Sequence, residues 1–538
     1  MRTWIETVLP RAEVQGTPSL KWIYPSHTIQ EAYSSYLSDE SNLSGGKADY
    51  LAFPHSEAQL CEAVHFAQEK RIPITISSGR TGIVGGGVPM GGLLISMENY
   101  NQILDVRREP STGFWRVRVQ SGLSLEKIAR IHELLPQNGA FSELERFFYP
   151  PDPTEKSAHI GGNVATNASG ARSFFYGPTR NYICGLRVVL SDATLLEIPR
   201  GEYVATTDPA FEIRTGNKTQ KIPLPTYRFP SVKNAAGYWS NRPYDLIDLF
   251  IGSEGTLGII SEVEMLFLPK PECVFGAVAF FSSESEALGF VKKVKQEAKS
   301  EFGQLTAVEF FDAYGLSLIR QLGSSGNVRS PQYSSSIPDH ANSAVYVEWN
   351  TTKHALDSLV SNFETHLKAF GSSLDNAWGG MDPSELHIFY EFRHALPEII
   401  NRLIANRKQM CPHLHKVSTD FVVPESAFDA MFQAYREILD KANLEYTIFG
   451  HIGENHVHVN MLPKNEEELH IAKKAYWTLA QLAVQYNGTI SGEHGIGKLK
   501  THLLRLMYDD NALTEMKQLK KMLDPLGLLG IGTLFEQI

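Results

Sequence analysis

The sequence has few cysteines and no surplus of basic residues, and both shortages exclude classes of protein. Its 538 residues include four isolated cysteines, Cys61, Cys184, Cys273 and Cys411. The lack of a CxxC pair excludes a cysteine-held iron–sulfur or zinc cluster and is typical of a reducing compartment. The formal net charge of −10 leaves no positive surplus for phosphates, so no nucleic-acid partner is expected.

Long apolar segments are also missing. The longest apolar run, Cys273–Phe281, is far shorter than the ~20 residues that a membrane-spanning helix needs. Glu6 falls inside what would be the apolar core of a signal peptide. We therefore expect a soluble, cytoplasmic protein, and the sequence leaves open a peripheral association with the inner membrane and a homodimer.

Two familiar nucleotide-binding motifs are absent. No GxGxxG follows an expected strand, which excludes the Rossmann fingerprint for a dinucleotide. The GxxxxGK at Gly492–Lys498 is followed by Leu499, where a P-loop needs Ser or Thr. A nucleoside triphosphatase is therefore not expected.

The chain instead has glycine-rich loops beside regular elements. A helix is expected from Ser56 to Lys70, with Ser56 as its cap, followed by a strand at Ile72–Ser77. A glycine-rich segment runs from Ser77 to Gly92, and another from Ala158 to Gly177. Glycines let a backbone approach a ligand closely, and their amides form concave sites for anions. These loops predict the binding of a large, polar, phosphate-bearing molecule.

Four blocks in one order and spacing resemble the vanillyl-alcohol-oxidase-type (PCMH-type) FAD flavoproteins. They are Ser78–Gly82 with Gly85–Gly87, Pro150–Pro153 leading into Ile160–Ala168, Tyr176–Gly177, and Gly252–Gly258. Within this family the chain looks like the D-lactate, glycolate and D-2-hydroxyglutarate dehydrogenase branch. The resemblance implies an α+β fold of two domains, an FAD-binding domain and a cap domain built on an antiparallel sheet.

The resemblance also implies the FAD contacts and the domain boundaries. The first glycine loop is expected to hold the pyrophosphate and the second to follow the flavin and ribityl chain. The first loop lacks the histidine to which some relatives attach flavin, so we expect non-covalent FAD. The expected domains are an N-terminal extension (1–45), an FAD-binding domain (46–270), a cap and substrate domain (271–485) and a C-terminal segment (486–538) that returns to the FAD-binding domain. The expected FAD contacts are Ser77, Ser78, Gly79, Arg80, Thr81, Gly82, Pro151, Ser157, Gly161, Gly162, Asn163, Asn167, Gly170, Gly252, Glu254, Gly255 and Ile260.

A dense polar stretch lies at 450–460, GHIGENHVHVN. In an extended strand His456, His458 and Asn460 share one face, and His451 can fold back across the Gly453 turn. The sequence SGEHG follows at 491–495. Two or three imidazoles with a carboxylate form the ligand set of an open divalent-metal site, although a hydrogen-bonded histidine cluster without metal is the alternative.

By resemblance, His451, His458 and Glu493 are the metal ligands and His494 is the acid/base. The metal would be zinc or manganese. Arg393 and Lys416 match the family's clamp for a substrate carboxylate, and Asn460 is a further catalytic candidate. The family usually reads Asp-Gly-Asn where this chain has Glu454, Asn455 and His456, so His456 could add a ligand or narrow the substrate pocket.

The sequence thus predicts FAD-dependent oxidation of a D-2-hydroxy acid to the 2-oxo acid. Electrons would pass to a quinone, a cytochrome or an electron-transfer flavoprotein. One alternative is a non-redox transferase like alkyl-glycerone-phosphate synthase, whose run of histidines is replaced here by Gly492–Gly495 with its glutamate. The other is a flavin-binding electron-transfer subunit of a larger complex, which would have no need of the His, Glu and Arg set.

Overall fold

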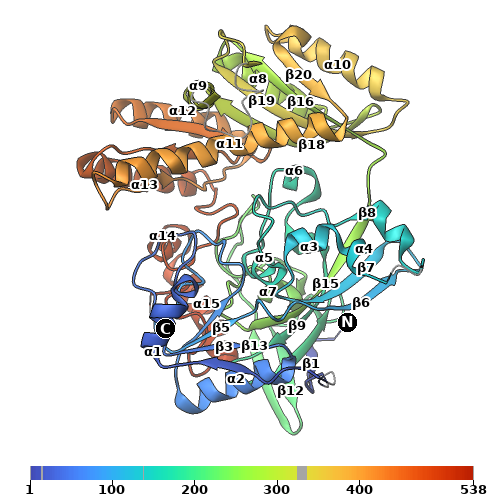
Figure 1. The fold of residues 1–538 in the computed structure, drawn as a ribbon, viewed down its shortest axis with the longest axis vertical. Coiled ribbons are helices and arrows are strands. Elements are labelled where there is room, and N and C mark those ends of the chain that lie inside the picture. The colour runs from blue at the N-terminus through green and yellow to red at the C-terminus, as the bar shows by residue number, and fades with distance from the viewer. Residues whose placement is uncertain (1, 12, 14–15, 137–138, 324–335, 537–538) are drawn as a thin grey trace. The chain divides into compact units, whose positions relative to one another are not determined.

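The computed structural model describes residues 2–11, 13, 16–136, 139–323 and 336–536, in two compact units. The first unit contains Met1–Gly170, Gly177–Lys270 and Glu493–Ile538. The second contains Ala171–Tyr176 and Pro271–Gly492. The chain therefore crosses between the units four times. Both units combine helices and sheets, so the predicted α+β class is confirmed (Figure 1).

The first unit is built on two main sheets and a short β-ribbon. The first 45 residues contribute to both sheets, through β1 and β2. The nine-stranded sheet has the order β13 (Lys218–Pro223), β12 (Ala210–Thr215), β1 (Trp4–Val8), β10 (Leu195–Pro199), β9 (Ile183–Val189), β15 (Ile259–Pro269), β7 (Trp115–Gln120) and β6 (Ile103–Arg108), with β8 (Phe147–Phe148) paired to β15. The four-stranded sheet has the order β2 (Lys21–Ile23), β3 (Tyr50–Phe53), β5 (Leu93–Ser96) and β4 (Ile74–Ser77), and the ribbon pairs β11 (Val204–Ala205) with β14 (Tyr244–Asp245).

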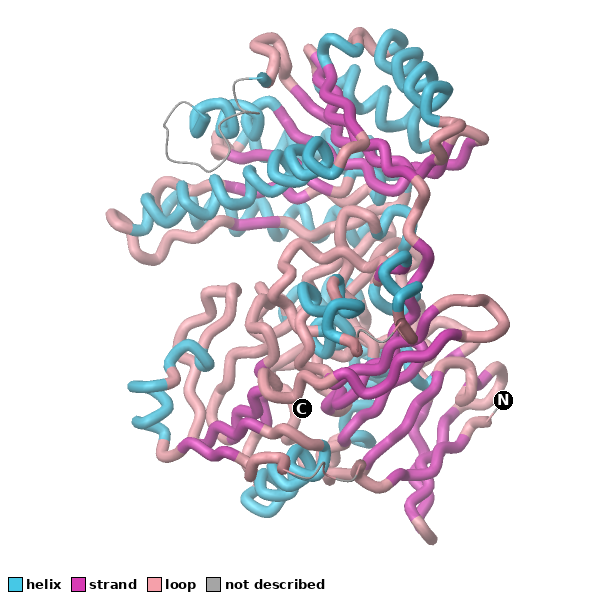
Figure 2. Tube along the Cα trace, turned by 45° about the vertical axis from the view of Figure 1, so that its right-hand side comes forward, coloured by secondary structure: helices cyan, strands magenta, loops and turns pink. Residues whose placement is uncertain are grey.

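Helices of the first unit are mostly short, and long loops separate them, drawn in pink in Figure 2. The longest include α2 (Glu57–Lys70), where the Ser56 side chain accepts a hydrogen bond from the Gln59 amide and caps the helix as predicted. The others are α1 (Ser26–Ala32), η1 (Ser34–Leu37), α3 (Leu125–Ala129), α4 (Ile131–Leu134), η2 (Ser142–Arg146), α5 (Ile160–Thr166), η3 (Thr179–Tyr182), α7 (Leu246–Phe250), α14 (Thr501–Met507) and α15 (Asp510–Leu523).

The second unit is organised around an antiparallel eight-stranded sheet, as predicted for the cap domain. Its order is β20 (Ala377–Gly380), β16 (Cys273–Phe281), β19 (Ser343–Thr351), β18 (Gly303–Asp312), β22 (Tyr446–Gly450), β23 (His458–Met461) and β21 (Val417–Ser418), with β17 (Lys299–Ser300) paired to β18. Its helices are α6 (Ser173–Tyr176), α8 (Glu284–Gln296), α9 (Ala313–Gly323), α10 (Leu356–Ala369), η5 (Leu374–Asn376), α11 (Pro383–Lys408), α12 (Glu425–Lys441), η6 (Ile452–Glu454) and α13 (Glu466–Gln485).

Helices cover both faces of this sheet (Figure 1), which explains why most side chains of its central strands are buried. In β16, Phe280 packs against Phe392 of α11, whereas its neighbour Phe281 packs against Phe290 of α8. Alternate side chains of a strand point to opposite faces, so both sets are buried. Among the described residues of the whole chain, no helix combines the length and apolar composition that a membrane crossing requires.

Candidate active site

The first glycine-rich loop begins where β4 ends. Ser77 closes β4 and is fully buried, and Arg80 turns the chain with a left-handed φ of 58°. The Ser77 and Ser78 hydroxyls and the Arg80 Nη1 are buried without a hydrogen-bond partner among the described residues. Buried polar atoms without partners are costly, so this loop presents groups that a polar ligand can satisfy.

The second glycine-rich segment forms α5 and lies against the first loop. A Cβ on Gly79 would lie 3.0 Å from the Ala158 Cα, and one on Gly161 would lie 2.6 Å from the Ser121 Cβ. These approaches explain the glycines. Beside them the His159 Nδ1 and Ser121 Oγ are further buried atoms that no described residue bonds. Burial, together with the charge of Arg80, lowers the pKa of His159 to about 4.

The third predicted segment joins the end of α5. The Gly252 amide donates to the Val164 carbonyl (2.9 Å) and the Glu254 amide to the Ala165 carbonyl (2.7 Å). Asn167 ends α5 with φ of 50°, and its side chain accepts a hydrogen bond from the Arg180 amide. The other predicted FAD contacts lie on these segments or beside them: Thr81, Gly82, Pro151, Ser157, Gly162, Asn163, Gly170, Gly255 and Ile260.

These three segments fit a phosphate-bearing cofactor. They bring together glycines that admit close approach of the backbone and five buried polar atoms that lack partners in the described chain. Amides and side-chain donors of this kind bind pyrophosphate oxygens well.

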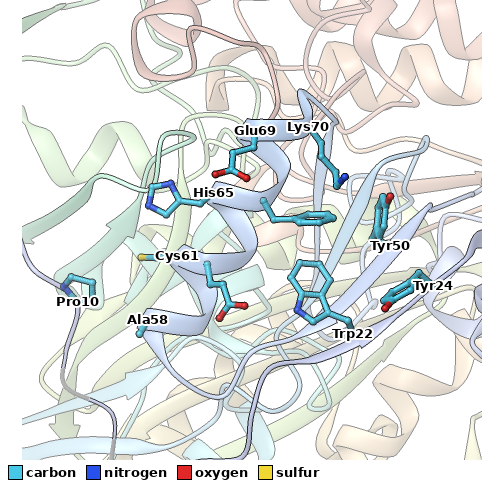
Figure 3. Close-up of a pocket in the computed structure, with 11 residues that line it drawn as sticks. Pro10, Trp22, Tyr24, Tyr50, Ala58, Cys61, His65, Glu69 and Lys70 are labelled. Carbon is cyan, nitrogen blue, oxygen red and sulfur yellow. The ribbon is translucent and has the colours of Figure 1, made fainter.

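A groove of about 820 Å³ lies elsewhere on the first unit, along α2 (Figure 3). Its walls include Trp22, Tyr50 and Phe66, with the Trp22 and Phe66 ring centroids 4.7 Å apart. No residue of the predicted site is among the described residues that line it. It is therefore a separate surface feature.

The predicted histidines meet in the second unit, at the sheet edge formed by β22, β23 and β21. His451 follows β22, whereas His458 opens β23 and His456 precedes it. The His456 and His458 ring centroids are 4.7 Å apart, and each lies 5.4 Å from that of His451. Asp420, His456 and His458 offer ligand atoms within 4.8 Å of one another.

Hydrogen bonds to acceptor oxygens fix the tautomers of these rings. His458 Nδ1 lies 3.2 Å from the Thr419 carbonyl, and His451 Nδ1 lies 2.6 Å from the Glu309 carboxylate. Because both partners are acceptors, each Nδ1 carries a hydrogen, and in the neutral imidazole the Nε2 then carries the lone pair that a metal needs. In His456 the hydrogen is instead on Nε2, because that atom lies 3.0 Å from the Asp420 carboxylate.

Arg393, on α11, shares the Glu309 carboxylate with His451. Its Nε lies 3.3 Å from Glu309 Oε2. Burial raises the pKa of Glu309, but Arg393 and His451 outweigh it and hold the pKa at about 2. Glu309 therefore remains a carboxylate between two donors, and it is a residue that sequence reasoning missed.

Lys416 and Asn460 lie near the same strands. Lys416 donates to Asn401 Oδ1 at 2.8 Å, and burial lowers its pKa. Asn460 is buried in β23 opposite Thr447 and Ser418.

Glu493 and His494 belong to the first unit and follow Gly492 directly. Glu493 Oε2 accepts from Ser169 Oγ (3.2 Å) and lies 3.1 Å from Lys233 Nζ. Its other oxygen lies 3.7 Å from His494 Nε2. The residue before this pair, Gly492, belongs to the second unit, where its amide donates to the Asp420 carbonyl at 2.7 Å.

Comparison with known proteins finds family matches in two stretches of the chain. Residues 48–199 match the FAD binding domain family, and residues 270–534 match the family described as FAD linked oxidases, C-terminal domain. The chain belongs to the FAD-linked oxidases. The resemblance predicted from the sequence is thereby confirmed, as is the two-domain PCMH-type fold.

Relatives of this FAD-linked oxidase share about a quarter of its sequence over nearly the whole chain. Glycolate oxidase subunit GlcD of Bacillus subtilis is 27% identical, covering 91% of this chain and 89% of the relative. D-lactate dehydrogenase of Anaerostipes hadrus is 27% identical, with 95% of both chains covered. D-2-hydroxyglutarate dehydrogenase of Stutzerimonas stutzeri is 28% identical, covering 94% and 95%.

Solved structures share the fold of this FAD-linked oxidase. An alkyldihydroxyacetonephosphate synthase aligns with a TM-score of 0.61 at 16% identity, covering 98% of this chain and 89% of its own. A 4-ethylphenol oxidase from Gulosibacter chungangensis aligns with a TM-score of 0.63 at 14% identity, covering 95% and 94%. At these identities the likeness concerns architecture alone.

Proposed function

We propose that this FAD-linked oxidase converts a D-2-hydroxy acid of the D-lactate type to the 2-oxo acid and passes the electrons to a separate acceptor. The observation that carries the proposal is the group of His451, His456, His458 and Asp420 beside the Glu309–Arg393 pair. Such a group can hold a metal and a carboxylate at once. The names of the relatives at 27–28% identity point to the same substrate class.

FAD supplies the hydride acceptor when it is bound to the first unit. We propose that it is held without a covalent bond, because no histidine stands at positions 77–82. Acid precipitation of the yellow protein should release all of the flavin to the supernatant. Flavin that remains in the precipitate would contradict the non-covalent attachment.

His494 takes the proton of the substrate hydroxyl in this proposal. A histidine titrates close to neutral pH and can therefore accept and release a proton during turnover. The Glu493 Oε1 lies 3.7 Å from the His494 Nε2.

Arg393 orients the substrate through its carboxylate. A guanidinium offers five N–H donors in a planar fork, and the Arg393 Nε lies 3.3 Å from Glu309 Oε2. A fork of this kind suits bidentate recognition of a carboxylate. Lys416 and Asn460 are proposed as further polar contacts to the same substrate.

A divalent metal such as zinc or manganese would polarise the substrate hydroxyl and lower its pKa. We propose His451 and His458 as imidazole ligands, because their Nε2 atoms carry the lone pairs, and Glu493 as the carboxylate ligand. Asp420 and His456 are the additional candidates. Without a metal, the same side chains would form only a hydrogen-bonded cluster.

Anaerobic reduction of the bound flavin tests the function directly. D-lactate, glycolate and D-2-hydroxyglutarate would be mixed with the purified protein, with L-lactate as the stereochemical control. We expect bleaching of the flavin absorbance by at least one of the three substrates and not by L-lactate. A flavin that none of these acids reduces would contradict the proposal.

Metal content tests the ligand set separately. His458→Ala should lower the zinc or manganese bound after dialysis and abolish flavin reduction while FAD stays in place, since FAD belongs to the first unit. His65→Ala, an exposed change on α2, is the control. Full activity in metal-free protein would return the histidines to a structural role.

A further inference from the structure

Glu254 holds the segment that follows the catalytic pair Glu493–His494. Its Oε1 accepts a hydrogen bond from the Ile496 amide (2.9 Å), and its Oε2 accepts one from the Gly497 amide (2.6 Å). Both oxygens of one carboxylate are thus used on two consecutive peptide groups. The Glu254 amide itself donates to Ala165 at the end of α5, so one residue connects the flavin-side segment with the catalytic segment.

The backbone conformations of Gly495 and Glu254 fit the contact between Glu254 and the segment that follows His494. Gly495 has a left-handed φ of 80°, and a Cβ there would lie 3.0 Å from Glu254 Cδ and 3.2 Å from each of its oxygens. Glu254 has a left-handed φ of 54°, which is uncommon for a residue with a Cβ. Such backbone conformations persist where the surrounding structure fixes them.

Lys498 fixes the same segment to the first glycine loop. Its amide donates to the Val84 carbonyl at 2.8 Å, and its Nζ donates to the Gly85 and Gly86 carbonyls at 3.1 Å each. A Cβ on Gly497 would lie 2.1 Å from the Val84 oxygen. The amides of residues 496–498 and the side chain of Lys498 are therefore held by hydrogen bonds.

On the other side of the catalytic pair, Gly492 donates to the Asp420 carbonyl in the second unit. Only Glu493 and His494 stand in the chain between Gly492 and Gly495. Within the first unit, the first amide held by Glu254 is that of Ile496, two residues after His494. Small displacements of a reacting group can lower a rate by about a hundredfold, so such restraint has catalytic value.

We propose that Glu254 is a positioning residue for His494: its carboxylate, by holding the Ile496 and Gly497 amides, sets where the His494 imidazole stands. The proposal rests on the proposed function only in giving His494 the role of base. The sequence resemblance implied an FAD contact for Glu254, and the structure directs its carboxylate to the catalytic segment.

The electrostatic surroundings of Glu254 agree with this role. Burial raises its pKa to about 7, while the two amides and the charges of Lys498 and Lys500 oppose that rise. Burial likewise lowers the pKa of Lys498 to about 8. The two amides thus favour the charged carboxylate, which is the form that can accept from both of them.

Hydrogen–deuterium exchange on the FAD-loaded protein tests the contact without depending on turnover. In Glu254→Gln the side-chain amide places a donor against one of the two backbone donors. We expect exchange at Ile496 and Gly497 to become at least tenfold faster, with FAD content unchanged. Flavin reduction by the active hydroxy acid should slow by about tenfold to a hundredfold, with less than a twofold change in substrate Kd.

Two further variants keep the test decisive. Glu254→Asp retains the carboxylate and should restore part of both the protection and the rate. Gly495→Ala should disturb the contact from the other side if Glu254→Gln fails to fold. Glu126→Gln, which removes an exposed partner of Arg130, is the matched control and should leave both measurements unchanged.

The outcomes separate the two proposals. Unchanged exchange at Ile496 and Gly497 in Glu254→Gln would overturn the contact, whatever the protein oxidises. Faster exchange with a wild-type rate of flavin reduction would overturn the positioning of His494. Failure of every hydroxy acid to reduce the wild-type flavin would refute the proposed function alone, and the exchange experiment would still decide on the contact.

Discussion

Asp420 is fully buried and faces a fully buried histidine, His456, at 3.0 Å. Its second oxygen accepts from Ser491 Oγ at 2.6 Å. Carboxylates that orient a histidine typically contribute tenfold to a hundredfold to metal affinity. Removal of the Asp420 carboxylate should therefore weaken the orientation of His456 and with it the metal affinity of the histidine group.

We expect Asp420→Asn to lower metal affinity by about tenfold to a hundredfold. The measurement is the zinc or manganese retained across a series of chelator concentrations. Asp429→Asn is the matched control, because Asp429 is an exposed residue of α12 that forms an ion pair with Lys292 of α8. Equal retention in the two variants would remove Asp420 from the metal group.

His159 makes a prediction about pH. Its pKa in the folded protein is about 4, lowered first by burial and then by Arg80, against about 6.5 for an unperturbed histidine. Between these values the unfolded chain binds a proton that the folded chain does not, so stability falls as the pH falls from 6.5 to 4.

His159→Gln should therefore lose less stability on acidification than the wild type does. We expect a difference of about 2 kcal/mol or less between pH 7 and pH 5, measured by urea unfolding. Identical losses in the two proteins would place the acid sensitivity on other groups.

At the scale of elements, α5 depends on a close approach that glycine alone permits. A Cβ on Gly161 would lie 2.6 Å from the Ser121 Cβ, whereas one on Gly86 would meet nothing within 4 Å. Gly161→Ala should therefore displace α5, lower stability by about 1–3 kcal/mol and reduce FAD content. Gly86→Ala should leave both unchanged. Flavin absorbance per protein and urea unfolding provide the comparison.

Local elements of this chain could be predicted from the sequence because their causes are local. The cap at Ser56, the helix that begins after it and the strand that follows the helix all lie within one stretch of sequence. The glycines of the loops at 77–82 and 158–170 predicted that the backbone there is closely approached by other groups. The histidines at 451, 456 and 458 were identifiable because they are close in sequence.

Partners distant in sequence could not be predicted in this way. Glu309 is 142 residues from His451, and Asp420 is 36 residues from His456. In the sequence, Glu309 is one of two carboxylates, with Asp312, in the strand of residues 303–312, and nothing there indicates that it contacts His451. No local pattern in the sequence indicated that residues 171–176 would belong to the second unit, because their contacts are with residues far along the chain.

At the scale of the whole molecule, those six residues supply the cation of a partly buried ion pair. Arg172 donates to both oxygens of Glu348 at 2.7 and 2.9 Å, and Glu348 is buried in β19. Tyr346 and Thr306 donate to the same carboxylate at 2.9 and 3.0 Å. Burial alone would raise the pKa of Glu348, but Arg172 and these donors lower it by more, so the pKa of Glu348 lies below its usual value.

Arg172→Met should therefore leave a buried carboxylate without its cation and destabilise the second unit by about 2–4 kcal/mol. Arg172→Met combined with Glu348→Gln should recover part of the loss. Arg402→Met removes an exposed partner of Glu398 on α11 and should change stability by less than about 0.5 kcal/mol. Urea unfolding curves of the four proteins give the answer, and equal midpoints would show that the ion pair contributes nothing.

The membership of Ala171–Tyr176 in the second unit also limits how this architecture can be recombined. A graft of residues 271–492 onto another FAD-linked oxidase would carry Glu348 without Arg172, and Glu454 without Ser173, whose hydroxyl it accepts from. A working exchange must move two separated stretches together. Gene fusions and chimaeras that respect a single boundary at Lys270 should therefore yield insoluble products, whereas those that also transfer 171–176 should fold.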